Sequence, residues 1–332
     1  MAQSKAELPV ILGTMTFGEN SRITDLDEVK KMIEIFKSYG HNELDTARIY
    51  NSGTTEEYLG KIGTEGLIVA TKLYPSSRPD QLSNPDAVSH TPESIQKHVP
   101  KSMAALKLST VDIWYLHAPD PSTDYTVTLP AVNALYESKI FKSLGVSNYK
   151  AWEVARICEI CKTNNFPLPK VYQGVYNVIH REVEAELFSC LRYYGMSFYA
   201  YNPLAGGFFT AAGPKTMDGD VEEGTRFDKS KVTGKLYRNR YWKESYFKAR
   251  ALIEPLAEKE GLTLVEVALR WISHHSIMKK EHGDKVIIGA SSEKQLRENC
   301  EALEKGPLPA DIVEACDQAW VIVKPDCETY WR

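Results

Sequence analysis

Four side chains that can hold or transfer a proton lie where three short, mainly apolar runs of the sequence end: Asp45, Tyr50, Lys72 and His117. A tyrosine is a weak acid with an ordinary pKa near 10, and a neighbouring ammonium group lowers that pKa. A buried lysine keeps its charge only where a carboxylate balances it. The aspartate, lysine and tyrosine therefore form a relay that is able to give a proton to a developing alkoxide, while the histidine orients the same oxygen. Such a set suits carbonyl reduction, which also needs a hydride donor.

Each of these residues also has a simpler structural interpretation. Asp45 is typical of a turn or cap, and Lys72 of a solvated strand end. Tyr50 suits a half-buried aromatic position, and His117 suits a hydrogen-bonded histidine of the core. Their joint occurrence at the ends of successive apolar runs favours the catalytic interpretation.

Eight short β-branched or aromatic runs alternate with helix-like segments along the chain. The runs are Val10–Leu12, Glu43–Leu44, Leu67–Lys72, Val111–His117, Ser143–Val146, Val171–Val175, Ser197–Tyr201 and Val286–Gly289. This alternation favours a parallel (β/α)8 TIM barrel, an α/β fold, over a doubly wound sheet. No repeat or linker divides the 332 residues, so a single domain is expected over residues 1–332. The interval from Asn202 to Glu244 has no clean period and predicts a long loop after the seventh strand.

Helix start signals stand between these runs. Thr91-Pro92-Glu93 places a cap, a first-turn proline and an acid in order. Two further pairs have the spacing of a capping box, Thr54 with Glu57 and Thr263 with Glu266.

Composition excludes several classes of protein. Forty basic and 44 acidic residues give a net charge of −4 without a block of like charge, which argues against a nucleic acid or an anionic membrane as the main partner. No run approaches the length of a membrane span, and the first residues lack the order of a signal peptide. The six cysteines show no disulfide framework, so a cytoplasmic location is expected. No metal is expected, because Cys158 and Cys161 have no second ligand pair and His274-His275 lack a third ligand.

With these motifs the chain resembles the aldo-keto reductases from about Pro9 to its last residue. The matching segments are Leu44 to Tyr50 for the D-T-A-x-x-Y signature, Ala70-Thr71-Lys72 for the lysine strand, Tyr115-Leu116-His117 for the histidine strand and Gly145-Val146-Ser147-Asn148 for the nicotinamide clamp. The resemblance implies that Tyr50 is the proton donor, that Asp45 and Lys72 tune it, and that His117 contacts the substrate carbonyl.

Further segments are similar to the branch that holds aflatoxin-aldehyde and succinic semialdehyde reductases. They are Ala200 to Gly207, Tyr237-Arg238-Asn239-Arg240, Leu269-Arg270-Trp271 with His274-His275, and Tyr330-Trp331-Arg332. This likeness implies an NADPH-dependent reductase of small aldehydes, with a possible homodimer. It also implies a C-terminal helix and tail over the active-site face of the barrel.

The resemblance also assigns residues to the NADPH/NADP+ cofactor. Ser147, Asn148 and Gln173 would hold the carboxamide, and Tyr201 would stack on the nicotinamide ring. The other implied contacts are Met15, Asp45, Asn202, Pro203, Leu204, Ala205, Gly206, Gly207, Arg226, Ser291, Ser292, Lys294, Gln295, Arg297 and Asn299.

The residues themselves agree with part of this assignment. No G-x-G-x-x-G follows any strand, so a Rossmann cofactor site is absent. Backbone amides of Ala205-Gly206-Gly207 are able to approach an anion. Ser292 with Gln295 has capping-box spacing, and a helix N-terminus also suits a phosphate. Lys294 and Arg297 nearby favour NADPH over NADH.

The branch places Tyr237, Arg240 and the terminal Arg332 around an acidic group of the substrate. Guanidinium groups bind carboxylates bidentately, which favours short aldehydes with a remote acid. Without the family, Arg240 reads equally well as a solvated loop charge. Two departures bear on specificity: Arg48 puts a charge inside the D-T-A-x-x-Y turn, and Asp228–Lys235 is about one residue longer than the branch pattern.

Two other functions compete with an aldehyde reductase. One is a redox-sensing regulatory subunit that binds NADPH with little turnover, as in the potassium-channel β subunits of this fold. The complete catalytic set argues against it. The other is a barrel glycosidase, which needs two carboxylates flanking the bond, whereas Asp45 is expected beside a lysine.

Overall fold

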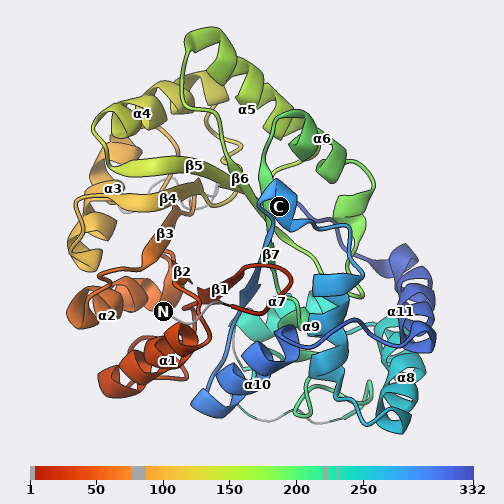
Figure 1. Ribbon diagram of the computed structural model, residues 1–332. Helices are drawn as coiled ribbons and strands as arrows, with labels where there is room; N and C mark the ends of the chain where they lie inside the picture. Colours follow the sequence, from red (N-terminus) through yellow and green to blue (C-terminus); the bar gives the residue numbers. More distant parts are fainter. Residues whose placement is uncertain (1–3, 77–86, 220, 222, 224, 231) are drawn as a thin grey trace.

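A computed structural model of the chain describes residues 4–76, 87–219, 221, 223, 225–230 and 232–332. Its eight parallel strands close into a barrel in chain order, with β1 paired to β8 (Figure 1). The strands are β1 (Val10–Gly13), β2 (Glu43–Asp45), β3 (Ile68–Leu73), β4 (Val111–Leu116), β5 (Phe141–Ser147), β6 (Val171–Val175), β7 (Ser197–Tyr201) and β8 (Lys285–Ile288). The predicted (β/α)8 fold is confirmed.

Helices surround the barrel and cover its apolar outer face (Figure 1). They are α1 (Leu26–Ser38), α2 (Thr54–Ile62), α3 (Pro92–Leu106), α4 (Tyr125–Glu137), α5 (Ala151–Asn164), α6 (Leu187–Tyr193), α7 (Val232–Tyr241), α8 (Glu244–Lys259), α9 (Leu264–His274), α10 (Glu293–Leu303) and α11 (Ala310–Val323). The strands are buried on both faces, which explains why they read as near-continuous apolar runs.

Of the three helix caps predicted between the strand runs, two are confirmed, and the cap predicted at Ser292 of α10 is confirmed as well. The Thr91 side chain accepts from Ser94 N, and Thr263 forms a capping box with Glu266. The third prediction is wrong, because Gly53 in a left-handed conformation precedes α2 and Thr54 is its first residue. The Thr54 hydroxyl instead donates to the Asn51 carbonyl at 2.9 Å.

The long segment after β7 is less irregular than its sequence suggests. Helix α7 occupies Val232–Tyr241, so Tyr237 and Arg240 lie on a helix and not in a loop. Its sequence shows no clear apolar stripe, because charged and polar residues occupy half of its positions, and the helical period is therefore hidden.

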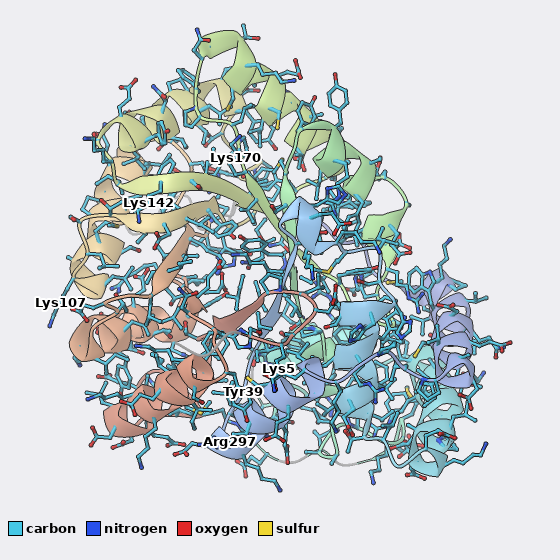
Figure 2. The ribbon with its side chains drawn as sticks, viewed as in Figure 1. Lys5, Tyr39, Lys107, Lys142, Lys170 and Arg297 are labelled. Atoms are coloured by element: carbon cyan, nitrogen blue, oxygen red, sulfur yellow. The ribbon has the colours of Figure 1, made fainter. Side chains whose placement is uncertain are left out.

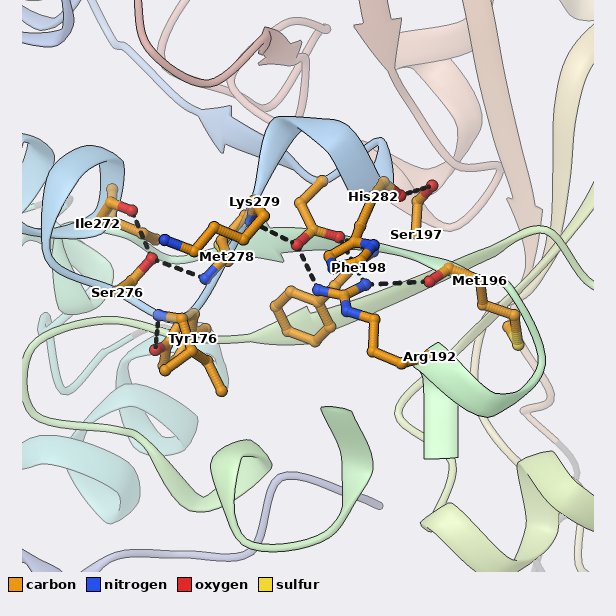
Figure 3. A network of polar contacts seen from close by, with 12 residues as sticks. Tyr176, Arg192, Met196, Ser197, Phe198, Ile272, Ser276, Met278, Lys279 and His282 are labelled. Atoms are coloured by element: carbon orange, nitrogen blue, oxygen red, sulfur yellow. Dashed lines mark hydrogen bonds and ion pairs between the residues drawn. The ribbon is translucent and has the colours of Figure 1, made fainter. Parts of the chain in front are cut away.

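The two ends of the barrel differ in the segments and hydrogen bonds that lie there. At the amino ends of β7 and β8, Asp284 accepts hydrogen bonds from Arg192, Phe198 N and Lys279 N (Figure 3). These hydrogen bonds join the segments at this end of the barrel and have a structural role. At the opposite end the C-terminal tail arrives, where Arg332 N donates to the Asn148 carbonyl at 3.1 Å. Helix α11 packs against α8, and it is the tail after α11 that reaches the carboxyl ends of the strands.

Candidate active site

The carboxyl ends of β2, β3 and β4 bring the four proton-handling residues together. Asp45 ends β2, Lys72 is the penultimate residue of β3, and His117 directly follows β4. Tyr50 follows β2 after one turn, which its backbone N–H closes on the Ala47 carbonyl at 3.0 Å. The sequence-based expectation that these side chains meet at one end of the barrel agrees with the structure.

Lys72 is the centre of the group. Its buried Nζ lies 2.6 Å from Asp45 Oδ2 and 2.8 Å from the Thr46 carbonyl. The same ammonium donates to the Tyr50 hydroxyl at 3.4 Å. The Tyr50 ring meets the His117 ring edge-on, with centroids 6.0 Å apart. A lysine thus connects the buried carboxylate to the phenol, as a proton relay requires.

Burial changes the acidity of these groups in directions that differ in part from expectation. It raises the pKa of Tyr50 well above 10, and the negative charge of Asp45 adds to that effect. The net pKa of Tyr50 is therefore raised, whereas a neighbouring ammonium was expected to lower it. Burial lowers the pKa of Lys72, against the attraction of Asp45. Burial and the charge of Lys72 keep the pKa of His117 well below 6.5, so its imidazole is neutral at physiological pH.

An unusual turn fixes Tyr50, and sequence reasoning missed the residue that holds it. Asn51, Ser52 and Gly53 all have positive φ, at 47°, 57° and 96°. The Asn51 side-chain amide donates to the carbonyls of Met15 and Phe17, each at 2.9 Å. Asparagine and glycine tolerate the left-handed region better than other residues, so the Asn-Ser-Gly sequence was the signal for this turn.

We expect Asn51→Ala to lower the free energy of unfolding by about 2–4 kcal/mol, because hydrogen bonds are lost and alanine is strained at positive φ. Turnover should fall about tenfold, since a barrier change of about 1.4 kcal/mol follows from a small displacement of Tyr50. Denaturant unfolding and steady-state kinetics measure the two effects. Asn164→Ala, at an exposed asparagine of α5, is the control, and equal effects of both variants would contradict the role of Asn51.

Arg48 turns away from the tyrosine. Its guanidinium donates to the Gly53 carbonyl at 3.1 Å and pairs with Glu56 at 3.5 Å and Glu57 at 3.4 Å. None of these three contacts is with Tyr50, so they give no direct support for the expected influence of this extra charge on access to Tyr50. Arg48 instead ties the turn after β2 to the first turn of α2.

The residues expected to hold a carboxamide form one network at the ends of β5 to β7. The Asn148 amide donates to Ser147 Oγ and to the His117 carbonyl, each at 2.9 Å. The Tyr201 hydroxyl donates to Asn148 Oδ1 at 2.7 Å. Gln173 donates to Asp45 Oδ1 at 2.8 Å, which links this network to the proton relay.

The segment Asn202–Gly207 turns sharply at the end of β7. Ala205, Gly206 and Gly207 have positive φ, and the amides of Ala205 and Gly207 bond to carbonyls within the same turn. The Tyr237 ring lies so close to Gly206 that a Cβ there would be 2.2 Å from it. Two of the amides expected to face an anion are thus used by the turn itself. Pro203 and Leu204 lie in the same turn.

Arg226 lies between the ends of β7 and β8. It donates to Asn202 Oδ1 at 3.2 Å and to the Tyr237 hydroxyl at 2.7 Å. A Cβ added at Gly289 would meet only Arg226 Nη2, at 3.7 Å, and one added at Gly207 only a threonine oxygen at 3.9 Å. Gly289 leaves open space beside the Arg226 guanidinium, and Gly207 leaves open space in the turn after β7, an arrangement that fits a phosphate-bearing ligand.

The expected adenosine end surrounds the start of α10. Ser292 caps this helix by accepting from Gln295 N, and Ser291 bonds to the Gln295 side chain at 2.8 Å. Lys294 is exposed and pairs with Glu298 at 3.7 Å. Arg297 lies beside Tyr39, the residue that follows the neighbouring α1 (Figure 2). Buried Asn299 donates to the Gly289 carbonyl at 3.2 Å, so it joins this end of the site to β8.

The three residues expected to contact a substrate acid lie near the relay. The charges of Arg226 and Arg240 lower the pKa of Tyr237 against the effect of its burial. Arg240 forms a hydrogen bond with Tyr201. The charge of Arg332 is close enough to contribute to the low pKa of His117. The exposed C-terminal arginine and the partly buried Arg240 thus supply positive charge near Tyr201 and His117.

Within the described ranges, no group of three His, Cys, Asp or Glu side chains is able to hold a metal ion. In that same part of the chain, no helix has the length and apolar character that a bilayer crossing requires.

A closed parallel barrel with an Asp–Lys–Tyr–His group at the carboxyl ends of its strands defines the chain as a (β/α)8-barrel enzyme. The model of the Aldo/keto reductase family matches residues 9–321, so the chain belongs to the aldo/keto reductase family. It is accordingly a nicotinamide-dependent oxidoreductase that acts on small molecules.

Individual relatives agree with this assignment. An aldo-keto reductase of Pseudocercospora fijiensis is 47% identical over 303 residues, which cover 90% of this chain and 100% of the relative. Aflatoxin B1 aldehyde reductase member 2 of Homo sapiens is 42% identical, covering 97% of this chain and 89% of its own. Aldo-keto reductase pigE of Monascus ruber is 36% identical, over 99% and 98% of the two chains. The resemblance to the aflatoxin-aldehyde reductase branch is confirmed.

Proposed function

We propose that the protein reduces small aldehydes to alcohols with NADPH, using Tyr50 as the general acid. The observation that carries this proposal is the position of Lys72, 2.6 Å from Asp45 and 3.4 Å from the Tyr50 hydroxyl. A carboxylate, an ammonium and a phenol in contact provide a proton path to an oxygen above the tyrosine. The neutral His117 beside that ring is suited to donate a hydrogen bond to the same oxygen.

The described residues fit a nicotinamide dinucleotide, which would supply the hydride when bound. Ser147, Asn148 and Gln173 would hold its carboxamide, and Tyr201 would lie against its ring. Arg226 and the open space at Gly207 and Gly289 suit the pyrophosphate. The remaining contacts would come from Met15, Asp45, Asn202, Pro203, Leu204, Ala205, Gly206, Ser291, Ser292, Lys294, Gln295, Arg297 and Asn299.

The chain's own residues have distinct tasks in this reaction. Tyr50 is fully protonated at neutral pH because burial raises its pKa, so it enters the reaction as a donor. As negative charge develops on the substrate oxygen, the phenol proton is drawn toward it. Lys72 then stabilises the phenolate that remains, and Asp45 balances the ammonium. Gln173 holds Asp45 in place through its Oδ1.

The substrate class follows from the charges around the relay. Arg240 and Arg332, together with Tyr237 on α7, favour an aldehyde that carries a carboxylate or a second carbonyl. Relatives named aflatoxin B1 aldehyde reductase support dicarbonyl aldehydes as a second group of substrates. We place the reaction in detoxification or secondary metabolism.

The same resemblance supports a proposal for the domain organisation, the oligomeric state and the location of the protein. We propose one domain over residues 1–332, a homodimer and a cytoplasmic location. Sedimentation equilibrium across a range of protein concentrations tests the dimer directly. A single species with the mass of one chain would exclude it.

NADPH oxidation in the presence of succinic semialdehyde or para-nitrobenzaldehyde tests the function. We expect turnover of both, and a lower KM for the aldehyde that carries the carboxylate. Arg240→Leu should raise that KM about tenfold or more and leave the KM of the nitro compound near its wild-type value, because a charge-assisted hydrogen bond contributes about 1.5–3 kcal/mol. Tight NADPH binding without turnover of any aldehyde would favour the regulatory-subunit alternative.

The exposed cations of α10 give a separate prediction for the cofactor. Replacing both Lys294 and Arg297 with alanine should raise the KM for NADPH about tenfold or more, because contacts with a 2′-phosphate are lost. The KM for NADH should stay unchanged. Lys162→Ala, at an exposed lysine of α5, is the matched control. Equal losses with both cofactors would contradict the assignment of these cations to the 2′-phosphate.

A further inference from the structure

Tyr115 is a buried aromatic residue that the proposed reaction does not use. It lies on β4, two residues before His117, and its side chain is fully buried inside the barrel with Tyr199 and five aliphatic residues. Parallel pairing aligns it with Lys72 on β3. The Lys72 ammonium lies 5.7 Å from the centre of its ring, within the range of a cation–π contact.

We propose that Tyr115 is a positioning residue whose ring stabilises the charged form of Lys72 and holds that ammonium against Tyr50. The inference rests on the proposed role of Lys72 in the reaction. Lys72 has three N–H donors, and Asp45, the Thr46 carbonyl and the Tyr50 hydroxyl receive them. The ring faces of Tyr50, at 5.1 Å, and of Tyr115 add to these contacts.

A buried ammonium needs this additional support. Desolvation favours the neutral amine and lowers the pKa of Lys72. The charges that act on it are Asp45 from β2 and Glu56 from α2, while His117 after β4 is neutral. Asp45 is the carboxylate in direct contact with it. The electron-rich face of Tyr115 supplies negative potential without a second charge in the barrel.

The ring of Tyr115, and not its hydroxyl, provides this effect. The hydroxyl lies toward Gln173 but has no hydrogen bond of normal distance and angle to any described residue. A phenylalanine at this position would keep the ring face and lose only that oxygen. The proposal therefore predicts opposite outcomes for two substitutions at one site.

A glycine on the next strand fixes where the ring lies. Tyr115 pairs with Gly145 on β5, and a Cβ at Gly145 would lie 2.3 Å from two atoms of the Tyr115 ring. An alanine there would force the ring to move. Gly145→Ala is thus a second way to disturb the contact with Lys72 while Tyr115 remains.

The test is a direct titration of the Lys72 amino group in the full-length, cofactor-free protein. Nuclear magnetic resonance of protein with isotope-labelled lysine resolves the amino groups, and Lys72→Met identifies the signal. We expect Tyr115→Leu to lower the pKa of Lys72 by about one unit, a tenfold loss of proton affinity. Tyr115→Phe should retain the wild-type pKa, and Gly145→Ala should lower it.

Tyr199→Leu is the matched control. Tyr199 lies in the same interior group, but its ring is 5.2 Å from the ammonium of Lys285. Its removal should leave the Lys72 titration unchanged. An unchanged or raised Lys72 pKa in Tyr115→Leu would overturn the proposal, as would an equal shift in the control. If Tyr115→Leu does not fold, Gly145→Ala and Tyr115→Phe decide the question by the same titration.

Activity gives a second, independent reading. The alkaline limb of the pH profile of kcat should move to lower pH in Gly145→Ala and Tyr115→Leu, because Lys72 loses its proton earlier. The KM for the aldehyde should change little. Since the titration needs no turnover, a failure of the proposed reductase function would leave the Lys72–Tyr115 result intact and is separately visible in the kinetics.

Discussion

Tyr50→Phe is expected to reduce the rate of aldehyde reduction by about 10²–10⁴-fold, the usual contribution of a general acid. Phenylalanine keeps the ring that meets His117 edge-on and removes only the hydroxyl to which Lys72 donates. The substrate oxygen would then have no acid in direct contact. The loss should therefore appear in kcat, with little change in the KM for the cofactor.

Single-turnover measurements with NADPH separate this loss from slow product release. Cofactor binding, followed by fluorescence, should match the wild type, because the proposed cofactor contacts do not include the tyrosine hydroxyl. Tyr136→Phe, at an exposed tyrosine of α4, is the control for removing a phenol oxygen elsewhere. A Tyr50→Phe enzyme within about threefold of wild-type kcat would show that the acid is another group.

Lys72→Met extends this test to the relay. The substitution leaves the buried Asp45 carboxylate without its cation, and removing one partner of a buried pair costs about 3–5 kcal/mol of folding free energy. The double variant Asp45→Asn with Lys72→Met removes both charges and should regain part of that stability. It should not regain turnover, because the Tyr50 phenolate would still lack its ammonium.

The fold could be predicted because each strand carries its own signal. Strands buried on both faces read as short apolar runs, and threonine caps mark α3 and α9 in the sequence. Helix α7 could not be found in this way, since Lys235, Arg238 and Arg240 are interspersed with its core-facing tyrosines. Its position depends on contacts such as that of Tyr237 with Gly206, which join residues far apart in the chain.

The sequence predicted which residues of the candidate site lie together, but not their acidity. The carboxyl ends of parallel strands meet, so residues at the ends of β2, β3 and β4 had to lie close together. The acidity of Tyr50 was not predictable, because burial and the Asp45 charge outweigh the ammonium and are visible only in three dimensions. The contact of Tyr115 with Lys72 likewise depends on strand pairing.

The protein is expected to lose about 5 kcal/mol of folding free energy between pH 7 and pH 5, from three buried histidines alone. Burial lowers the pKa of His41 and His90 to about 4 and that of His180 to about 3. In the unfolded chain each histidine takes up a proton near pH 6.5. The unfolded state then binds more protons than the native state, so stability falls as the pH drops below that value.

Two buried carboxylates act in the opposite direction. Burial raises the pKa of Glu43 and Glu56, so the native state takes up a proton there before the unfolded state does. Their effect stabilises the fold as the pH falls toward their native pKa values. The net loss is thus smaller than the contribution of the histidines, and single variants are needed to isolate one of them.

His180→Leu isolates one such contribution. Both ring nitrogens of His180 are buried without a hydrogen-bond partner among the described residues, so the substitution breaks no side-chain hydrogen bond. In this variant, the decrease in the free energy of unfolding between pH 7 and pH 5 should be about 2 kcal/mol smaller than in the wild type. This difference does not depend on how much the substitution changes the free energy of unfolding at pH 7. Urea unfolding at both pH values measures the difference, with His282→Leu at an exposed position as the control. An identical pH dependence in His180→Leu and wild type would show that this imidazole is protonated in the native state at pH 5, in spite of its burial and of the positive charges of Arg240 and Lys243.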